Sequence, residues 1–192
     1  RIAHLAARLM AEDGIDDYAS AKRKAARQAG VPQTRELPTN EEIDAELRAY
    51  RALYQQDHPE QLRELRILAL ALMDDLERFT PYITGAVLKG SAGKYAGIHL
   101  HLYTDDAKSV EHYLIDHCVD FRMRESRLYA GDLALTVPVL TYAVGGVDVR
   151  LTVLSPRELR TQLRTSPDGR PIERARRAAL EALMDEALMD EE

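Results

Sequence analysis

Hydrophobic residues in the first half of the chain recur at the spacing of amphipathic helices, in which every third or fourth residue faces a core. The pattern predicts a first helix over residues 2–10, a second over residues 19–29 and a third that begins after Thr39. Thr39 and Glu42 have the spacing of a capping box, in which each side chain accepts a hydrogen bond from the other residue's backbone N–H. The N-terminal half is therefore predicted to be helical.

The longest apolar stripe of the chain follows a break at His58-Pro59. It extends over residues 62–79, and charged residues occupy other positions around the same turns. A helix with one apolar stripe must bury it against another element. We expect this helix to pack on a sheet formed by the rest of the chain.

From Pro81 onwards the apolar pattern changes from the period of a helix to that of strands. A short apolar run over residues 82–88 predicts a strand that ends at Gly90-Ser91, and residues 98–103 alternate as a half-buried strand does. Three more strands are predicted over residues 121–128, 133–144 and 147–154. Together these segments predict a mixed sheet of about five strands.

Turn and cap signals separate these strands. Asp105 or Asp106 can cap a helix over residues 107–117, and Gly145-Gly146 is typical of a tight hairpin turn. Pro138 has no backbone N–H to donate to a neighbouring strand. It therefore predicts that the strand around it is broken, bulged or at an edge of the sheet.

The C-terminal segment returns to a helical pattern. A short helix is predicted from Pro156 and a longer one over residues 172–189. The fold class is therefore α/β, of the α+β kind, with helices flanking a mixed sheet. A helical N-terminal region is expected over residues 1–79, and a sheet domain with a C-terminal helix over residues 80–192.

Charge and cysteine content narrow the classes of function. The chain has 26 basic and 32 acidic residues, a net charge of −6, which disfavours a broad nucleic-acid surface but allows a small phosphate-bearing substrate. Its single cysteine cannot form a disulfide within the chain. The sequence has no signal-peptide pattern and no apolar run of the ~20 residues that span a membrane. We expect a soluble, cytoplasmic protein without a membrane partner.

Candidate chemistry gathers between Gly90-Ser91 and the strands that follow. The strand over residues 98–103 carries His99 and His101 at alternate positions, and a later strand carries Asp148. Residues two apart on a strand point to the same face of a sheet. The two imidazoles are therefore predicted to share one face.

This arrangement resembles the polymerase-β-type nucleotidyltransferase superfamily, as a divergent bacterial member, over about the last 110 residues. Such enzymes have a Gly-Ser pair after one strand, an Asp-x-Asp on the next and a third carboxylate on a later strand. The resemblance implies a nucleotidyltransferase-like sheet that binds a nucleoside triphosphate over Gly90 and Ser91, with Lys94 or Lys89 near the phosphates. It also implies that Asp148 is the matching catalytic carboxylate and that a divalent metal such as Mg²⁺ takes part.

The sequence departs from this family at the Asp-x-Asp. The matching residues are Gly97-Ile98-His99 in one register and His99-Leu100-His101 in the other, and neither register supplies a carboxylate. An imidazole is a poor ligand for Mg²⁺ but a good one for Zn²⁺, and it also suits Mn²⁺ or iron. The ordinary two-cation chemistry of the family is therefore in question for this chain.

Three interpretations follow from these residues. One is metal-dependent nucleotide binding or nucleotidyl transfer with Asp148 as the remaining carboxylate. Another is a catalytically inactive interaction or regulatory protein that binds a protein partner through its N-terminal helices. The third is a transition-metal site of His99, His101 and Asp148. The alternative to such a site is that the two histidines simply face solvent on an open strand.

Overall fold

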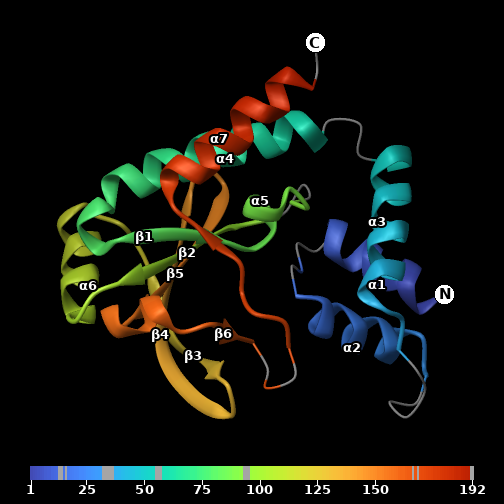
Figure 1. Cartoon of the computed structure of the whole chain (residues 1–192), viewed down its shortest axis with the longest axis horizontal. Coiled ribbons are helices and arrows are strands. Elements are labelled where there is room, and N and C mark those ends of the chain that lie inside the picture. The colour runs from blue at the N-terminus through green and yellow to red at the C-terminus, as the bar shows by residue number, and fades with distance from the viewer. Residues whose placement is uncertain are drawn as a thin grey trace.

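The protein combines a small helical bundle with a twisted mixed sheet that is covered by helices on one face (Figure 1). The predicted α/β fold with a helical N-terminal segment is confirmed. Within the 192-residue chain, the computed structural model describes residues 1–12, 15, 17–31, 37–54, 58–92, 96–165, 167 and 169–190.

The N-terminal bundle consists of α1 (Ile2–Glu12), α2 (Tyr18–Gln28) and α3 (Asn40–Tyr54), and α1 packs against the other two. Its apolar side chains form a cluster of their own, separate from the core of the sheet. The predicted capping box is confirmed at the start of α3. The Thr39 N–H donates to Glu42 Oε2 at 2.7 Å, and the Glu42 N–H donates to Thr39 Oγ1 at 3.2 Å.

The described strands form one sheet in the order β6-β3-β4-β5-β2-β1-β7. Each neighbouring pair is antiparallel except β2 and β5, which run parallel at its centre. Between these two strands the chain passes through α6 (Ala107–Asp116), whose first turn is capped by Asp106 as predicted. The strands are β1 (Pro81–Thr84), β2 (Ile98–Tyr103), β3 (Arg122–Ala130), β4 (Leu133–Val144), β5 (Val147–Leu154), β6 (Leu163–Arg164) and β7 (Arg174–Ala175).

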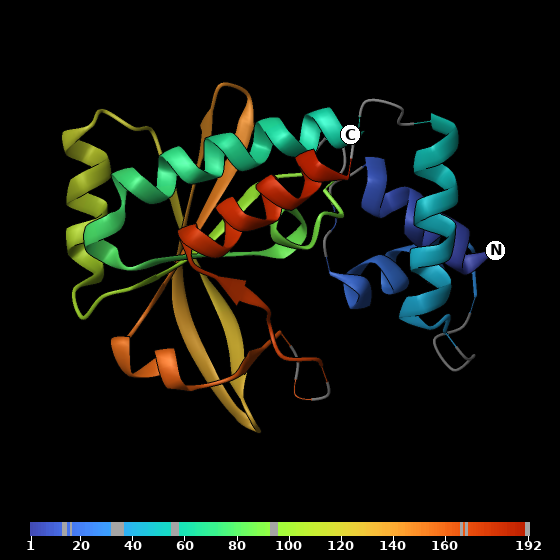
Figure 2. The same cartoon turned by 45° about the horizontal axis from the view of Figure 1, so that its top comes forward.

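Helices cover one face of this sheet. The helices α4 (His58–Asp75) and α7 (Arg177–Met189) lie side by side across the sheet. The helix α6 lies at the side of the sheet that faces away from α1, α2 and α3 (Figures 1 and 2). The long stripe of α4 packs into the main core, as expected from the sequence. No helix of the described residues has both the length and the apolar composition needed to cross a membrane. Fully buried members of the core include Met73, Leu76, Ile83, Leu100 and Leu151.

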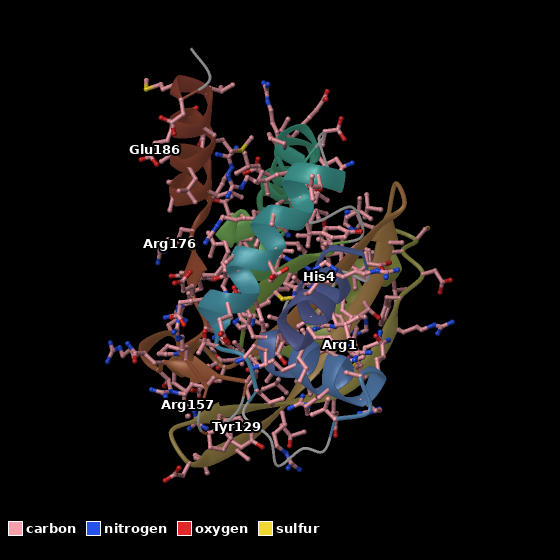
Figure 3. The ribbon with its side chains drawn as sticks, turned by 90° about the vertical axis from the view of Figure 1, so that its right-hand side faces the viewer. Arg1, His4, Tyr129, Arg157, Arg176 and Glu186 are labelled. Atoms are coloured by element: carbon pink, nitrogen blue, oxygen red, sulfur yellow. The ribbon has the colours of Figure 1, made fainter. Side chains whose placement is uncertain are left out.

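The opposite face is covered only towards one end. There Leu159 of the 3₁₀ helix η2 (Pro156–Arg160), together with Ile172, packs on a second apolar cluster that includes Leu128, Leu154 and Leu163. Figure 3 shows Arg157 of η2 and Tyr129 of β3 at this end of the molecule, whereas Arg176 lies higher, where β7 passes into α7. Beyond this end, the same face carries Arg122, Arg150 and His99, none of which is fully buried, and we call this part the uncovered face of the sheet.

Two elements differ from the sequence prediction because tertiary contacts redirect the chain. The strand predicted to end at Gly90-Ser91 stops at Thr84, and a short helix α5 (Gly85–Lys89) follows, with its apolar residues buried. The helix predicted over residues 172–189 begins only at Arg177. The residues before it pair with the free edge of β1 as β7, a contact that the local pattern does not reveal.

Pro138 does not break its strand. β4 is continuous, and Pro138 lies opposite Glu125 of β3 in an unbroken register. The pairing of β4 with β5 begins only at the next residue, Val139. Pro138 therefore lies where β4 has a strand on one side only, which is why the missing donor is tolerated.

Truncation of Met73 tests the packing of α4 on the sheet. Met73 is 2% exposed, whereas Ile67 on the same helix is 51% exposed. We expect Met73→Ala to lower the free energy of unfolding by about 2–5 kcal/mol, because it removes buried apolar atoms and leaves a cavity. Ile67→Ala should change it by no more than about 0.5 kcal/mol. Equal losses in urea unfolding would contradict this packing.

Candidate functional site

The uncovered face of the sheet brings basic side chains together from neighbouring strands. Arg122 of β3 lies opposite Thr141 of β4, Thr141 lies opposite Arg150 of β5, and Arg150 lies opposite His99 of β2. Residues that are directly opposite one another in a sheet point to the same face. These four side chains therefore form one row across the strands.

Arg124 adds a further positive charge beside this row, because it lies two residues beyond Arg122 on the same strand face. We call Arg122, Arg124, Arg150 and His99 the basic strip. Arg122 and Arg124 are exposed, whereas Arg150 and His99 are half-buried. Neighbouring strands are about 4.8 Å apart, so one small ligand can contact several members of the strip.

Asp148 is the one carboxylate that the described strands place on this face. It lies two residues before Arg150 on β5 and opposite Ala143 of β4, and it is exposed. Gly97, the residue before β2, lies beside Asp148, and a Cβ atom at this position would lie 2.8 Å from the backbone oxygen of Asp148. A side chain at position 97 would therefore force the two strands apart, so the carboxylate missing from this position has no room.

The predicted metal-binding residues share a face but do not converge. His99 lies opposite Arg150 and His101 opposite Thr152, so the three candidates are staggered along two strands. Among the described residues, no three histidine, cysteine, aspartate or glutamate side chains are placed to hold a metal ion together. The donor set therefore does not fit the paired-cation arrangement that the family resemblance implies.

Gly90 and Ser91 follow directly after α5 and close its C-terminal end. Gly90 has a φ of +76°, and both its N–H and that of Ser91 donate to the Ala86 carbonyl, the latter at 3.0 Å. These two N–H groups are thus already used to close the helix, and they are not offered to a phosphate in the way that the resemblance implies. Lys94 lies outside the described residues, and Lys89 is exposed on α5.

Two arginines from other helices hold this end of α5. Arg66 of α4, which is 8% exposed, donates from Nε to the Val87 carbonyl and from Nη2 to the Leu88 carbonyl, both at 3.0 Å. Arg51 of α3 donates from Nη2 to the Ser91 carbonyl. Burial lowers the pKa of both guanidinium groups. Helix-end carbonyls need such donors when they are removed from water.

His101 differs from its neighbour His99 because it is buried, with 7% of its surface exposed. Burial, with smaller contributions from the nearby His99 and Arg174, lowers its pKa from the usual 6.5 to about 4. The imidazole is therefore neutral near pH 7. Its side chain lines a cavity of about 300 Å³, whose other lining residues are Tyr103, Thr161, Gln162, Leu163, Pro171, Ile172 and Arg174.

An arginine and two tyrosines make one wall of this region. Arg174 of β7 donates to the Tyr103 hydroxyl and to the Leu159 carbonyl. Its guanidinium also lies 5.0 Å from the ring centroid of Tyr82 and 5.2 Å from that of Tyr103. Arg176 donates from Nε to the Tyr82 hydroxyl at 2.8 Å. Hydrogen bonds and cation–ring contacts together therefore fix the positions of Tyr82, Tyr103 and Arg174.

Sequence reasoning found the histidines and Asp148 but missed the arginines of this face. Arg122, Arg124 and Arg150 lie in predicted strands, so their alternation was an available signal. Arg174 lies in a segment predicted as helix, and its contacts arise only because β7 joins the sheet. Gln162 belongs to a segment without periodicity, which gave no signal.

Replacement of Arg66 tests its role at the end of α5. Arg66→Met keeps the length of the aliphatic stem but removes both hydrogen bonds, and it leaves two buried carbonyls without donors. We expect the free energy of unfolding to fall by about 2–4 kcal/mol. Arg63→Met, at an exposed position of the same helix, is the matched control and should change it by at most about 0.5 kcal/mol. An unchanged free energy of unfolding in Arg66→Met would mean that the cost of burying the Arg66 charge offsets the contribution of its two hydrogen bonds.

The lowered pKa of His101 predicts a pH dependence of stability. The unfolded chain takes up this proton near pH 6.5 and the folded protein only near pH 4, so stability must fall as the pH drops through this window. The loss attributable to His101 is on the order of 3 kcal/mol. Urea unfolding of His101→Gln should lack this component. Unfolding curves of the two proteins that shift in parallel between pH 7 and pH 4 would contradict the prediction.

Comparisons with known proteins do not assign a family. No protein-family model matches the chain, and no curated protein matches it. The resemblance to nucleotidyltransferases therefore stays a prediction, and function has to be inferred from the uncovered face of the sheet itself.

Proposed function

We propose that this protein binds a nucleoside triphosphate on the uncovered face of its sheet, with the phosphates on the basic strip. The observation that carries this function is the in-register row of Arg122, Arg150 and His99 on three different strands. These side chains come from three different strands and project to one side of a rigid scaffold.

The chemistry of the strip suits phosphate oxygens. A guanidinium group presents several N–H donors in one plane and binds phosphate through two of them at once. It also keeps its charge at every physiological pH. The net charge of −6 does not oppose such binding, because the local field is set by the nearest charges, and among the described strands Asp148 is the one carboxylate on this face.

Asp148 gives a triphosphate with Mg²⁺ a second point of attachment. Mg²⁺ in proteins is commonly held by one or two carboxylates together with the phosphates of the substrate and several waters. Asp148 lies on the same face as the strip, two residues from Arg150. One carboxylate suits a hydrated ion carried in by the nucleotide. A nucleotidyl transfer that needs two cations held by the protein does not fit the residues present, so the proposed function is binding.

Thermal-shift measurements with ATP, GTP, CTP and UTP, each with Mg²⁺, test this function. A ligand that binds the folded state raises the melting temperature by an amount set by its concentration relative to the dissociation constant. Arg122→Gln should weaken binding of the preferred nucleotide about tenfold, because one charge-assisted hydrogen bond is lost. Arg127→Gln is the matched control, since it removes the same charge from the opposite face of the same strand.

The two variants separate a site from a general charge effect. Equal weakening by Arg122→Gln and Arg127→Gln would reduce the effect to net charge and contradict the assigned face. Absence of a shift with all four nucleotides would overturn the function. The interaction role of the N-terminal helices would then be the better explanation.

Asp148→Asn tests the role of the carboxylate. The variant should lose the part of the nucleotide affinity that depends on Mg²⁺, because the amide carries no charge for the cation. Binding measured in EDTA should stay the same or strengthen, since a negative charge near the phosphates is removed. An unchanged response to Mg²⁺ in Asp148→Asn would show that the carboxylate does not meet the ion.

A further inference from the structure

A cavity beside His101 lies next to the basic strip. His101 lies two residues beyond His99 on β2, so both side chains project from the same face. They are also close enough for the charge of His99 to lower the pKa of His101. A ligand whose charged end lies on the strip can therefore extend a neighbouring group towards the cavity.

The lining of the cavity is suited to an uncharged group. His101 as a neutral imidazole offers one donor and one acceptor, and Gln162 and Thr161 offer both kinds of group. Leu163 and Ile172 supply an apolar wall. No carboxylate lines the cavity along its described residues.

Arg174, the one charged group of the lining, is already engaged. Its guanidinium donates to Tyr103 and to the Leu159 carbonyl, and it contacts the rings of Tyr82 and Tyr103. It therefore acts first as a brace that fixes the tyrosine ring of the wall. Tyr103 is 4% exposed, so it contributes little more than a rigid edge to the cavity.

We infer that this cavity receives the base of the nucleotide, with His101, Gln162 and Thr161 as the groups that recognise its edge. A nucleobase is a flat heterocycle with donors and acceptors on its rim and apolar faces, and the lining has both kinds of surface. The cavity volume of about 300 Å³ is at the lower limit for small-molecule sites, which is consistent with one heterocycle. This inference rests on the proposed function. It assigns a site to the base of the nucleotide, which the basic strip does not contact.

Calorimetric titration with inorganic tripolyphosphate and with the four nucleoside triphosphates tests the inference. Tripolyphosphate carries the phosphates without the base, so it measures the strip alone. We expect at least one nucleoside triphosphate to bind about tenfold or more tightly than tripolyphosphate, since a good hydrogen bond and apolar contacts are added. The nucleotides should also differ among themselves.

Variants then locate the additional affinity. Gln162 is exposed, so Gln162→Ala should fold normally and lose about tenfold in nucleotide affinity while tripolyphosphate binding stays unchanged. His101→Gln, which keeps a donor and an acceptor in another shape, should change the order of preference among the bases. Gln28→Ala, at an exposed position of α2, is the control and should bind like the original protein.

Three results would overturn the base site, and they differ in what they leave of the phosphate site. Nucleotides and tripolyphosphate binding with equal affinity would overturn the base site while leaving the phosphate strip in place. A preference for nucleotides that persists in Gln162→Ala and is unaltered in order in His101→Gln would place the base elsewhere and also overturn the inference. Binding of neither ligand would overturn the proposed function, and the base site with it.

Discussion

The structure depends on the burial of one face of a single sheet. Alternate residues of β2 and β5, such as Ile98, Leu100 and Leu151, are completely removed from water beneath the helices. Because the side-chain period of a strand is two, fixing these residues inward also fixes which residues point outward. A shift of register by one residue would bury His99 and Arg150 beneath the helices, at a prohibitive cost. The apolar core therefore determines which polar groups meet on the uncovered face.

A second constraint links the N-terminal helices to this sheet. The carbonyl groups at the end of α5 are removed from water, and their donors come from Arg66 of α4 and Arg51 of α3. A further contact joins Glu41 of α3 to Arg170 in the segment before β7, at 3.4 Å. The exposed ion pair contributes little to stability. If the guanidinium groups of Arg66 and Arg51 moved away, by contrast, the carbonyl groups at the end of α5 would lose their hydrogen-bond donors. The position of the bundle is thus tied to the loop that carries Gly90 and Ser91.

Periodicity alone predicted most of the architecture, because apolar stripes and alternation are local properties of the sequence. The capping box at Thr39, the cap at Asp106 and the packing of α4 on a sheet were all readable in this way. The failures lie where distant segments decide the conformation. The residues at 174–175 became a strand because β1 had a free edge, and the apolar run after Thr84 became a helix whose end Arg66 can cap.

The candidate site was predictable only in part for the same reason. His99, His101 and Asp148 were correctly expected on strands, but their stagger along β2 and β5 depends on a register that no local pattern encodes. The cavity at His101 also needs Gln162, from a segment without periodicity, and Arg174, from a segment whose pattern predicted a helix. Functional side chains that share one strand can be recognised from the sequence. A site formed by side chains of several strands can be recognised only when the strand pairing is known.

Nuclear magnetic resonance of the ¹⁵N-labelled protein, titrated with a nucleoside triphosphate and Mg²⁺, locates the nucleotide on the protein without a substitution. Binding on the uncovered face predicts that the largest shifts of backbone amide signals fall in β2, β5 and the first residues of β3, with further shifts at Thr161, Gln162 and Leu163. Shifts confined to α1–α3, or an unchanged spectrum at millimolar nucleotide, would contradict the assignment of the uncovered sheet face as the ligand-binding surface.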